Sequence, residues 1–585
     1  MSTFMDEYRR WISDEVFDAD TKAELLGIEG NTREIEDRFY KELEFGTAGL
    51  RGVVGAGANR MNDYTVGKVT QGLCDFIASE AGDGAKGRGV VIAYDPRRKS
   101  REFAEGCGAI IAANGIKAYL FDDIRPTPLL SFALRRLNCV AGIVITASHN
   151  PKEYNGFKVY GEDGAQMSVN NSNKVVEYTN RLQGYGDIKR IPFEEARKLG
   201  LLQFIGKEID DEYIKNVRSL SLRNDEIRAS GILKDFKVIY TPLHGTGNIL
   251  VRRILSELGF ENVLVVPEQE APDPDFSTVE SPNPENSSAF NMAIELAKKE
   301  NVDIIIGTDP DCDRIGVVFK DYSGEYITLN GNQIGCLLMD YILSSLTETE
   351  KLPSKPFVVK SIVTSRLADA IANYYGVEIF EVFTGFKYIC GLVKELDELG
   401  DRNFVYGFEE SHGYVAGTFV RDKDGVIASM LVAEMAAFYM TKGMTFADVL
   451  KRVYEKYGHT LDVVLSYTLK GKEGQDKIAQ TMKTLRAKTP AEFGGAKVRI
   501  CKDYLTGIVV DIIDNKSEKT DLVEKSNVLS FEMEDGSWYV IRPSGTEPKI
   551  KLYFGVSGKG REEAEDAMTR FRGSVTSVIE GMLYS

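Results

Sequence analysis

A serine in a loop after an apolar run is the first residue of this sequence with an evident chemical use. Ser148 stands in the run Thr-Ala-Ser-His-Asn-Pro, which directly follows the β-branched run Val140–Ile145. A short apolar run ended by turn-forming residues predicts a buried strand. Ligands of α/β proteins bind at the ends of such strands, so the hydroxyl is placed to react. For a lone serine, the alternative is a turn hydroxyl bonded to the local backbone.

A second cluster contains three carboxylates at every second position, namely Asp309, Asp311 and Asp313. If the backbone stays extended beyond the strand-like run Val302–Ile306, all three lie on one side and can hold a hard cation. Magnesium suits three charged oxygens that leave a position for a phosphate oxygen. A calcium EF-hand loop is excluded, because Arg314 stands where that loop needs glycine. The alternative is a solvated acidic turn.

Two more clusters carry groups that bind phosphates and sugars. The segment from Arg542 to Thr546 offers a guanidinium fork, two hydroxyls and glycine-exposed amides, a set that suits a phosphate dianion. Glu409 and Ser411, beside His412, offer acceptors and a donor that suit sugar hydroxyls. A capped turn and ordinary loop polarity are the respective alternatives. No P-loop, dinucleotide-binding pattern or Gly-x-Ser-x-Gly elbow occurs, so the kinase, dehydrogenase and esterase interpretations lose support.

The elements that position these clusters are predicted to be strands alternating with helices. The first segment, to about residue 205, contains a glycine-rich loop that includes Arg51, and the strand-like runs Gly89–Tyr94 and Val140–Ile145. Similar units begin at Lys237–Tyr240 and Phe357–Lys360. This alternation predicts largely parallel or mixed sheets covered by helices. From about residue 461 the pattern changes to a smaller α+β domain.

Composition restricts the class of protein. The 585 residues are too many for one core, and 43% apolar with 27% charged residues is typical of soluble globular proteins. The most apolar helical candidate, Val426–Met440, carries Glu434 and is interpreted as a core helix, so no membrane association is expected. The N-terminus has no secretory pattern, and seven cysteines without a C-x-x-C motif favour the reducing cytoplasm. A net charge of −16 argues against nucleic acid, and requires any site for an anionic substrate to be locally basic.

Taken in order, the four clusters resemble the signature loops of the α-D-phosphohexomutases, the phosphoglucomutase/phosphomannomutase family. The resemblance covers the chain from about residue 40 to the end, and the segment Glu44–Gly52 resembles the long branch that includes glucomutases and pentomutases. It implies an α/β fold class with three related α/β domains of mixed sheets and a C-terminal α+β domain, of the TATA-box-binding-protein-like type, around a central cleft. The expected domains are 1–205 with the phosphoserine loop, 206–322 with the metal-binding loop, 323–458 with the sugar-binding loops, and 459–585 with the phosphate-binding loop.

The resemblance also implies the roles of single residues. Ser148 is expected to be a phosphoserine whose phosphate completes the coordination of one Mg²⁺ per chain, with Asp309, Asp311 and Asp313 as the other metal ligands. The implied catalytic residues are Ser148, Arg51, His149, Lys158 and Lys423. The implied substrate-binding residues are Arg314, Thr384, Gly385, Glu409, Ser411, Arg542, Ser544, Gly545 and Thr546.

The implied reaction interconverts glucose 1-phosphate and glucose 6-phosphate. Ser148 gives its phosphoryl group to the sugar monophosphate, and the resulting glucose 1,6-bisphosphate, which is both intermediate and activator, reorients and returns its other phosphate. Positioning and charge neutralisation dominate such transfers. The preferred sugar stays open between glucose, mannose and pentose, and the assembly between monomer and homodimer. There are two alternatives from other classes. One is a magnesium-dependent phosphatase, against which the distal phosphate loop argues. The other is a catalytically silent phosphosugar-binding protein, against which the complete serine and aspartate motifs argue.

Overall fold

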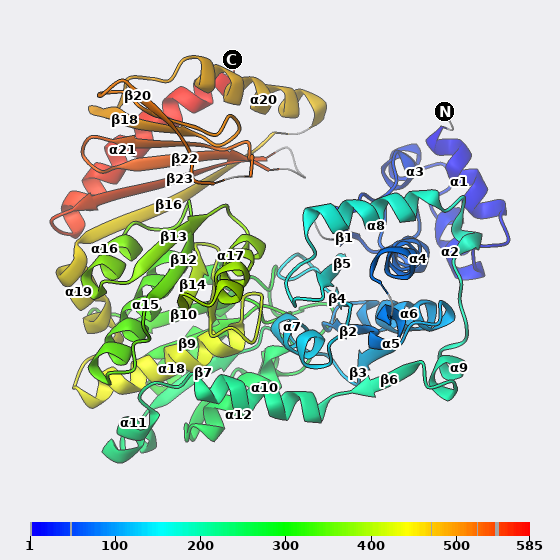
Figure 1. Cartoon of the computed structure of the whole chain (residues 1–585), viewed down its shortest axis with the longest axis horizontal. Helices are drawn as coiled ribbons and strands as arrows, with labels where there is room; N and C mark the ends of the chain where they lie inside the picture. The colour runs from blue at the N-terminus through cyan, green and yellow to red at the C-terminus, as the bar shows by residue number, and fades with distance from the viewer. Residues whose placement is uncertain are drawn as a thin grey trace. The chain divides into compact units, whose positions relative to one another are not determined.

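The computed structural model describes residues 3–46, 49–82, 84–469, 471–522, 524–544 and 549–584. The chain, coloured from the N-terminus to the C-terminus in Figure 1, forms two compact units. Unit 1 consists of Met1–Gly331, Cys390–Gly400 and Phe404–Phe446, and unit 2 consists of Asn332–Ile389, Asp401–Asn403 and Ala447–Ser585. The segment that contains Glu409 therefore belongs to the same unit as Ser148. The expected domain boundaries after residues 205, 322 and 458 stay predictions.

Unit 1 begins with three short helices around a small aromatic core. They are α1 (Phe4–Ser13), α2 (Ala19–Leu26) and α3 (Thr32–Phe39). Thr3 and Asp6 form a reciprocal capping box at the start of α1, which satisfies backbone amides that have no partner within the helix. The fully buried Trp11 stacks on Phe17 with ring centroids 4.1 Å apart, and this contact joins α1 to the segment before α2.

The sheet that carries Ser148 has six strands in the order β1-β5-β4-β2-β3-β6. The strands are β1 (Gly49–Val53), β2 (Val90–Tyr94), β3 (Ala118–Phe121), β4 (Ala141–Ile145), β5 (Tyr154–Gly161) and β6 (Leu202–Ile205). Strands β2, β3, β4 and β6 pair in parallel, whereas β5 runs antiparallel to β4 and β1, so the sheet is mixed as predicted. All residues of β2 and β4 are buried, which is why these strands read as continuous apolar runs in the sequence.

Helices cover this sheet. They are α4 (Asp63–Glu80), α5 (Ala85–Arg88), α6 (Ser100–Ala113), α7 (Thr127–Arg136), α8 (Val169–Arg181) and α9 (Phe193–Lys198). Helices α6 and α7 both contact β2, and α4 packs against α6 and α8 (Figure 1). The apolar sides of α4, α5, α6, α8 and α9 form one core with the sheet. The loop after β4 is thus held at the end of a rigid central strand.

The second sheet of unit 1 carries the aspartate triad and has the order β11-β10-β9-β7-β8. Its strands are β7 (Lys237–Thr241), β8 (Asn262–Val265), β9 (Ile304–Thr308), β10 (Ile315–Lys320) and β11 (Tyr326–Thr328). The helices of this region are α10 (Lys207–Ser219), α11 (Asn224–Ser230), α12 (Gly247–Glu257), α13 (Pro267–Glu270) and α14 (Asn291–Glu300). Strand β7 pairs in parallel with β8 and β9, and β10 returns antiparallel to β9, so the triad occupies the turn between β9 and β10.

The last part of unit 1 consists of a hairpin and a buried helix. In the hairpin β14 (Asn403–Glu409) pairs antiparallel with β15 (Gly413–Ala416), and helix α18 (Gly425–Thr441) follows. The Glu434 carboxylate is fully buried in α18 and accepts hydrogen bonds from the amides of Leu222 and Arg223, which confirms the interpretation of this helix as a core helix. Among the described helices, none alone is long and apolar enough to cross a membrane; α18 and α19 (Phe446–Tyr457) pass that test only as a bent pair.

Unit 2 contains a parallel strand pair and an antiparallel sheet. Strands β12 (Pro356–Ser361) and β13 (Glu378–Val382) pair in parallel, accompanied by α15 (Gly331–Glu348), α16 (Leu367–Tyr375), α19 and part of α17 (Phe386–Leu399). The antiparallel sheet has the order β16-β23-β22-β21-β18-β19-β20, with β17 (Glu492–Phe493) paired to β18.

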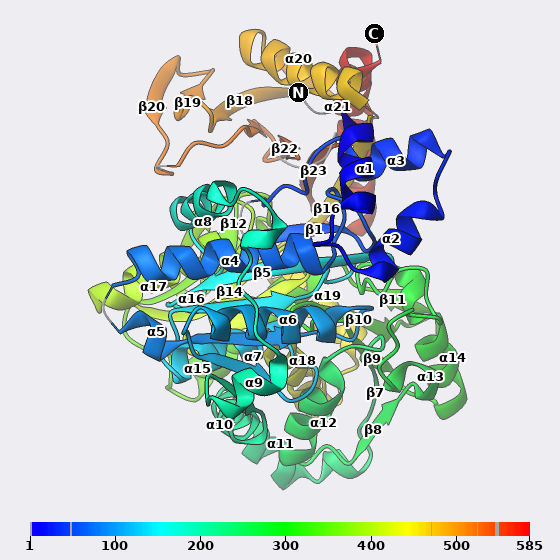
Figure 2. The ribbon, with the colours of Figure 1, turned by 90° about the vertical axis from the view of Figure 1, so that its right-hand side faces the viewer.

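Its strands are β16 (His459–Thr468), β18 (Ala496–Asp503), β19 (Ile508–Asp511), β20 (Lys516–Lys519), β21 (Leu529–Met533), β22 (Trp538–Pro543) and β23 (Lys549–Gly558). Strands β18, β19 and β20 form one end of this sheet (Figure 2). Residues of α20 (Gly471–Ala487) and α21 (Arg561–Leu583) share its apolar core. This is the smaller α+β domain predicted from the change of pattern near residue 461.

Candidate active site

The loop after β4 presents Ser148 in an unusual conformation. The residue is 3% exposed and has a φ of 53°, in the left-handed region that non-glycine residues rarely adopt. Its amide donates to Thr146 Oγ1 at 2.8 Å. Its Oγ donates to Asp309 Oδ2 at 2.8 Å and lies 3.2 Å from His149 Nδ1. The predicted meeting of the serine loop with the aspartate cluster is therefore seen directly.

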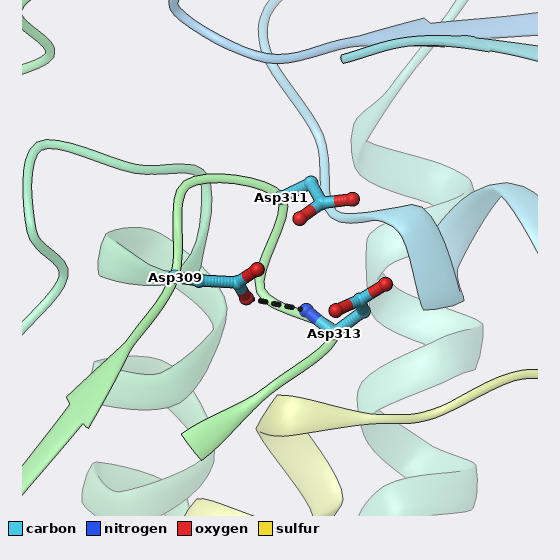
Figure 3. Close-up of side chains that lie close together, drawn as sticks. All are labelled: Asp309, Asp311 and Asp313. Carbon is cyan, nitrogen blue, oxygen red and sulfur yellow. Dashed lines mark hydrogen bonds between the residues drawn. The ribbon is translucent and has the colours of Figure 1, made fainter. Parts of the chain in front are cut away.

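The triad Asp309, Asp311 and Asp313 converges, but the reason expected from the sequence was wrong. One carboxylate oxygen from each residue lies within 4.8 Å of the others (Figure 3). The backbone is not extended; it turns, with Cys312 at a φ of 51° and its amide donating to the Asp309 carbonyl. Asp309 Oδ1 accepts the amides of Asp313 and Arg314 at 3.1 and 3.0 Å. The turn, rather than strand periodicity, gathers the carboxylates.

The oxygens of the triad fit a cation. Asp311 Oδ1 and Asp313 Oδ1 are buried and accept no hydrogen bond from the described residues. Burial and the two neighbouring carboxylates raise the pKa of Asp309 well above its ordinary value. Burial also opposes ionisation of Asp311, but Lys158 and further hydrogen bonds hold the pKa of that carboxyl below its usual range. Buried acceptors without donors, on three carboxylates in contact, are suited to coordinate a metal ion.

Two lysines supply positive charge to the triad. Lys158, on β5, donates to Asp311 Oδ2 at 2.8 Å. Lys423 Nζ lies 3.0 Å from Asp313 Oδ2 and 3.3 Å from Asp422 Oδ1. Burial opposes the charge of Lys423, but these two carboxylates raise its pKa above the ordinary value. The two ammonium groups therefore offset part of the negative charge of the carboxylates around them.

Gly413 lies directly beneath the Lys423 side chain. A Cβ at this position would lie 2.3 Å from Lys423 Cδ, so only glycine leaves room for the lysine to pass. The Cβ would also meet Glu409 Cγ at 3.3 Å. Gly413 thereby lets Lys423 and the predicted sugar-binding loop lie side by side.

The loop between β14 and β15 joins the metal loop through backbone contacts. Ser411 Oγ donates to Glu409 Oε1 at 2.8 Å, and the buried Glu409 Oε2 accepts no hydrogen bond from the described residues. His412 has a φ of 64°, and its Nδ1 lies 2.9 Å from the Ile315 carbonyl oxygen. Arg314 forms an isolated β-bridge with Gly413. Two predicted clusters, far apart in the sequence, thus form one continuous surface.

The remaining predicted residues of unit 1 lie around Ser148. Arg51, on β1, is exposed, and its Nη1 donates to Asn150 Oδ1 at 3.2 Å. Burial and the charges of Arg314 and Arg51 hold the pKa of His149 well below its ordinary value, so its ring is neutral. The Arg314 guanidinium pairs with Glu285, a residue that sequence reasoning did not identify.

The other predicted substrate-binding residues belong to unit 2. Thr384 and Gly385 lie between β13 and α17, Gly385 has a φ of 124°, and Thr384 Oγ1 is buried without a hydrogen-bond partner among the described residues. Arg542 lies near the end of β22, and the Ser544 amide donates to the Lys549 carbonyl at 2.7 Å. Gly545 and Thr546 lie outside the described residues.

Three supporting residues were missed by sequence reasoning. Thr127, at the start of α7, donates through its Oγ1 to Asp311 Oδ2 at 2.9 Å. Thr246 donates through its amide and its hydroxyl to the Pro310 carbonyl, which braces the metal loop. Arg97 donates hydrogen bonds to the carbonyls of Ser148 and Asn150 in the serine loop. Both Thr246 and Arg97 stand in polar loops that follow β7 and β2, so the strand-then-polar-loop pattern could have found them.

Comparison with protein families accounts for this arrangement. The phosphoglucomutase/phosphomannomutase alpha/beta/alpha domains I, II and III match residues 42–185, 211–324 and 330–457, and the C-terminal domain of the same family matches residues 490–571. A phosphoglucomutase of Staphylococcus epidermidis is 41% identical over 527 residues, which cover 90% of this chain and 93% of that protein. A phosphoglucomutase of Staphylococcus aureus is 39% identical over 525 residues, covering 89% and 91%.

Solved structures share the fold. The exocytosis-sensitive phosphoprotein parafusin of Paramecium, a phosphoglucomutase, aligns with a TM-score of 0.67 at 20% identity and covers 92% of this chain and 94% of its own. A phosphoglucomutase/phosphomannomutase family protein of Burkholderia thailandensis aligns with a TM-score of 0.63 at 18% identity, covering 92% and 97%. With all four domain matches and the identity to full-length relatives, the chain belongs to the phosphoglucomutase/phosphomannomutase family of enzymes.

Proposed function

We propose that this enzyme is a phosphoglucomutase, which interconverts α-D-glucose 1-phosphate and glucose 6-phosphate with Ser148 as the phosphoryl carrier. The observation that carries the proposal is the contact of Ser148 Oγ with Asp309 at 2.8 Å, inside a buried triad flanked by Lys158 and Lys423. A hydroxyl so placed can bear a phosphoryl group whose charge is met from several sides. The names of the 39–41% identical relatives support glucose as the sugar.

Different residues of unit 1 are assigned different roles in phosphoryl transfer. Asp309, Asp311 and Asp313, with an oxygen on Ser148, would hold one Mg²⁺, which supplies charge neutralisation to the transferring phosphoryl group. Lys158, Arg51 and His149, which contact Asp311, Asn150 and Ser148 respectively, would border the same phosphoryl group. Lys423, as an ammonium group, would stabilise negative charge on the attacking or leaving sugar oxygen.

Binding of the sugar and of its phosphates is assigned to the remaining predicted residues. Glu409 and Ser411, with Thr384 and Gly385, would bind ring hydroxyls in either orientation of the ligand, because these hydroxyls lie between its two phosphorylated ends. Arg314 would bind a substrate phosphate through its fork of donors. The distal phosphate is assigned to Arg542, Ser544, Gly545 and Thr546. Glucose 1,6-bisphosphate is then the reaction intermediate and an activator that restores phosphorylated Ser148.

A comparison of kcat/KM for glucose, mannose and pentose 1-phosphates, each after priming with glucose 1,6-bisphosphate, tests the proposal. We expect glucose 1-phosphate to be preferred and the label of a ³²P-phosphorylated Ser148 to appear in the sugar. A preference for mannose or pentose would keep the mechanism and change the substrate. Release of the label as inorganic phosphate alone would identify a phosphatase, and absence of any transfer a binding protein. We place the enzyme in the cytoplasm as a monomer or homodimer; fractionation and sedimentation velocity test these two assignments.

A further inference from the structure

One buried arginine uses four of the five donors of its side chain on the segment that carries Ser148, and the fifth on Asp95. The Arg97 side chain has no exposed surface. Its Nη2 donates to the carbonyls of Ser148 and Asn150 at 2.5 and 2.6 Å, and its Nη1 donates to those of Pro151 and Tyr154 at 2.9 and 3.1 Å. Its Nε donates to Asp95 Oδ2 at 3.1 Å. Five N–H groups thus have five acceptors, four of them backbone carbonyls of residues 148–154.

Asp95 links this guanidinium to the amide side of Ser148. Its Oδ2 accepts the Thr146 hydroxyl at 2.7 Å, and Thr146 Oγ1 in turn accepts the Ser148 amide at 2.8 Å. Its Oδ1 accepts the Ser100 hydroxyl at 2.7 Å and the Arg97 amide at 3.0 Å. Both backbone polar groups of Ser148 are therefore held by one buried network, which keeps the residue at its left-handed φ of 53°.

A residue of the domain that bears the aspartate triad packs against the Arg97 guanidinium. The Phe276 ring lies 4.9 Å from Arg97 Cζ, a distance typical of a cation–π contact. Ser281 Oγ donates to the His149 carbonyl at 2.9 Å, and Asp275 pairs with Arg98. The segment from Asp275 to Ser281 thus packs on the same loop. The serine loop is therefore held by the hydrogen bonds of Arg97 and also by contacts with the domain that bears the aspartate triad.

We propose that Arg97 is a positioning residue for phosphoryl transfer, which sets the place of Ser148 Oγ relative to the aspartate triad without contacting substrate or metal. This inference rests on the proposed role of Ser148. A lysine cannot replace Arg97, because its single ammonium group lacks the planar fork that reaches four carbonyls at once. Loss of the fork leaves buried carbonyls without donors and lets the loop move. A misplacement of about 1 Å can slow a reaction by about 100-fold.

The test compares Arg97→Lys with Arg60→Lys. Arg60 is a matched control, since it is buried and donates to the carbonyls of Asp37 and Asn59 and to the Asp37 carboxylate, but does not bind the serine loop. Four quantities are measured on each variant: the melting temperature, kcat and KM for glucose 1-phosphate, and the Kd for Mg²⁺ by calorimetry. We expect Arg97→Lys to lower kcat about 30- to 100-fold with KM within about twofold of wild type, and to weaken Mg²⁺ binding less than the loss of an aspartate ligand would, because the triad itself stays in place. Arg60→Lys should keep kcat even where its melting temperature falls.

A folded Arg97→Lys variant with kcat within threefold of wild type overturns the inference, as does an equal loss of kcat in Arg60→Lys. If Arg97→Lys does not fold, Phe276→Leu decides, because it removes the ring against the guanidinium and keeps the arginine. We expect a lower kcat, by about fivefold, at unchanged KM, and an unchanged kcat would overturn the inference. Failure of the proposed function is distinguishable, because wild-type enzyme would then transfer no phosphoryl group to or from Ser148.

Discussion

The polar loops of the two units differ in how deeply their side chains are buried and in how many partners these side chains have within the protein. In unit 1, Ser148 and the aspartate triad are buried, and hydrogen bonds or ion pairs connect them to one another and to the two lysines. In unit 2, the side chains of Thr384, Arg542 and Ser544 are only half-buried. The first region matches the need of phosphoryl transfer for groups fixed before the substrate arrives. The second matches loops that receive a ligand and complete their hydrogen bonds with it.

The largest expected effect is at the centre of the rigid region. Ser148→Ala removes the phosphoryl carrier while the backbone network of the loop stays in place, so turnover should fall by at least about 10⁴-fold. A coupled assay of glucose 6-phosphate formation measures the loss, and mass spectrometry should find no phosphorylated residue at position 148. Ser219→Ala, at the end of α10, is the matched control. Turnover near the wild-type rate would remove Ser148 from the mechanism.

A smaller loss is expected when one carboxylate of the triad becomes neutral. Asp311→Asn keeps the shape of the side chain but gives up a charged ligand, so the Kd for Mg²⁺ should rise by about 100-fold. Calorimetry measures the affinity, and kcat should recover in part at high Mg²⁺. Asp303→Asn, an exposed aspartate before β9, should leave both quantities unchanged. Equal Mg²⁺ affinity in Asp311→Asn and wild type would reduce the triad to an acidic turn.

A substitution in the predicted phosphate-binding loop of unit 2 should change KM more than kcat. Arg542→Ala removes a proposed contact to the non-reacting phosphate, which is bound in the ground state and the transition state alike. We expect kcat/KM for glucose 1-phosphate to fall by about 2–4 kcal/mol, mostly through KM. Hydrolysis of the phosphoserine relative to mutase turnover should rise, because a loosely held sugar admits water. Lys483→Ala, on the exposed side of α20, is the control; unchanged KM and hydrolysis would place the distal phosphate elsewhere.

The smallest effect is expected at Thr384. Its buried hydroxyl has no partner among the described residues, so Thr384→Val should cost little stability and should remove one hydrogen bond to the sugar. KM should rise by about fivefold, with kcat within about twofold. Thermal unfolding and steady-state kinetics on one preparation separate the two effects. A large fall in melting temperature at constant KM would show that this hydroxyl serves the fold and not the ligand.

Prediction from the sequence succeeded where local pattern decides the structure. Strand β4 begins one residue after the predicted start at Val140, and α18 follows the predicted helix within one residue at each end. Buried parallel strands and core helices can be recognised in a sequence because they appear as continuous apolar runs. The three aspartates predicted to form one cluster do lie within 4.8 Å of one another through their carboxylate oxygens. The roles of this cluster and of Ser148 stay predictions.

Prediction was wrong or silent where backbone conformation decides the geometry. The turn at Cys312, which gathers the triad, depends on a left-handed residue that no side-chain pattern marks. The strand-then-polar-loop pattern could have marked Arg97 and Thr246, but not the groups that they bind. Both donate to carbonyl groups, and every residue in a chain has a carbonyl, so the sequence does not indicate which ones. Such contacts become visible only when the fold has brought distant loops together.

The lysines beside the triad have a thermodynamic consequence for the order of binding. The carboxylates of Asp309, Asp311, Asp313 and Asp422 outnumber the ammonium groups of Lys158 and Lys423, so these side chains alone would oppose the binding of an anion. With a divalent cation held by the three aspartates, this excess would be cancelled, and Lys158 and Lys423 would be available to a phosphate. Cation and sugar phosphate must then raise each other's affinity by the same factor, because the two equilibria form one closed cycle. The enzyme would be selective for its ligand only when the ion is already in place.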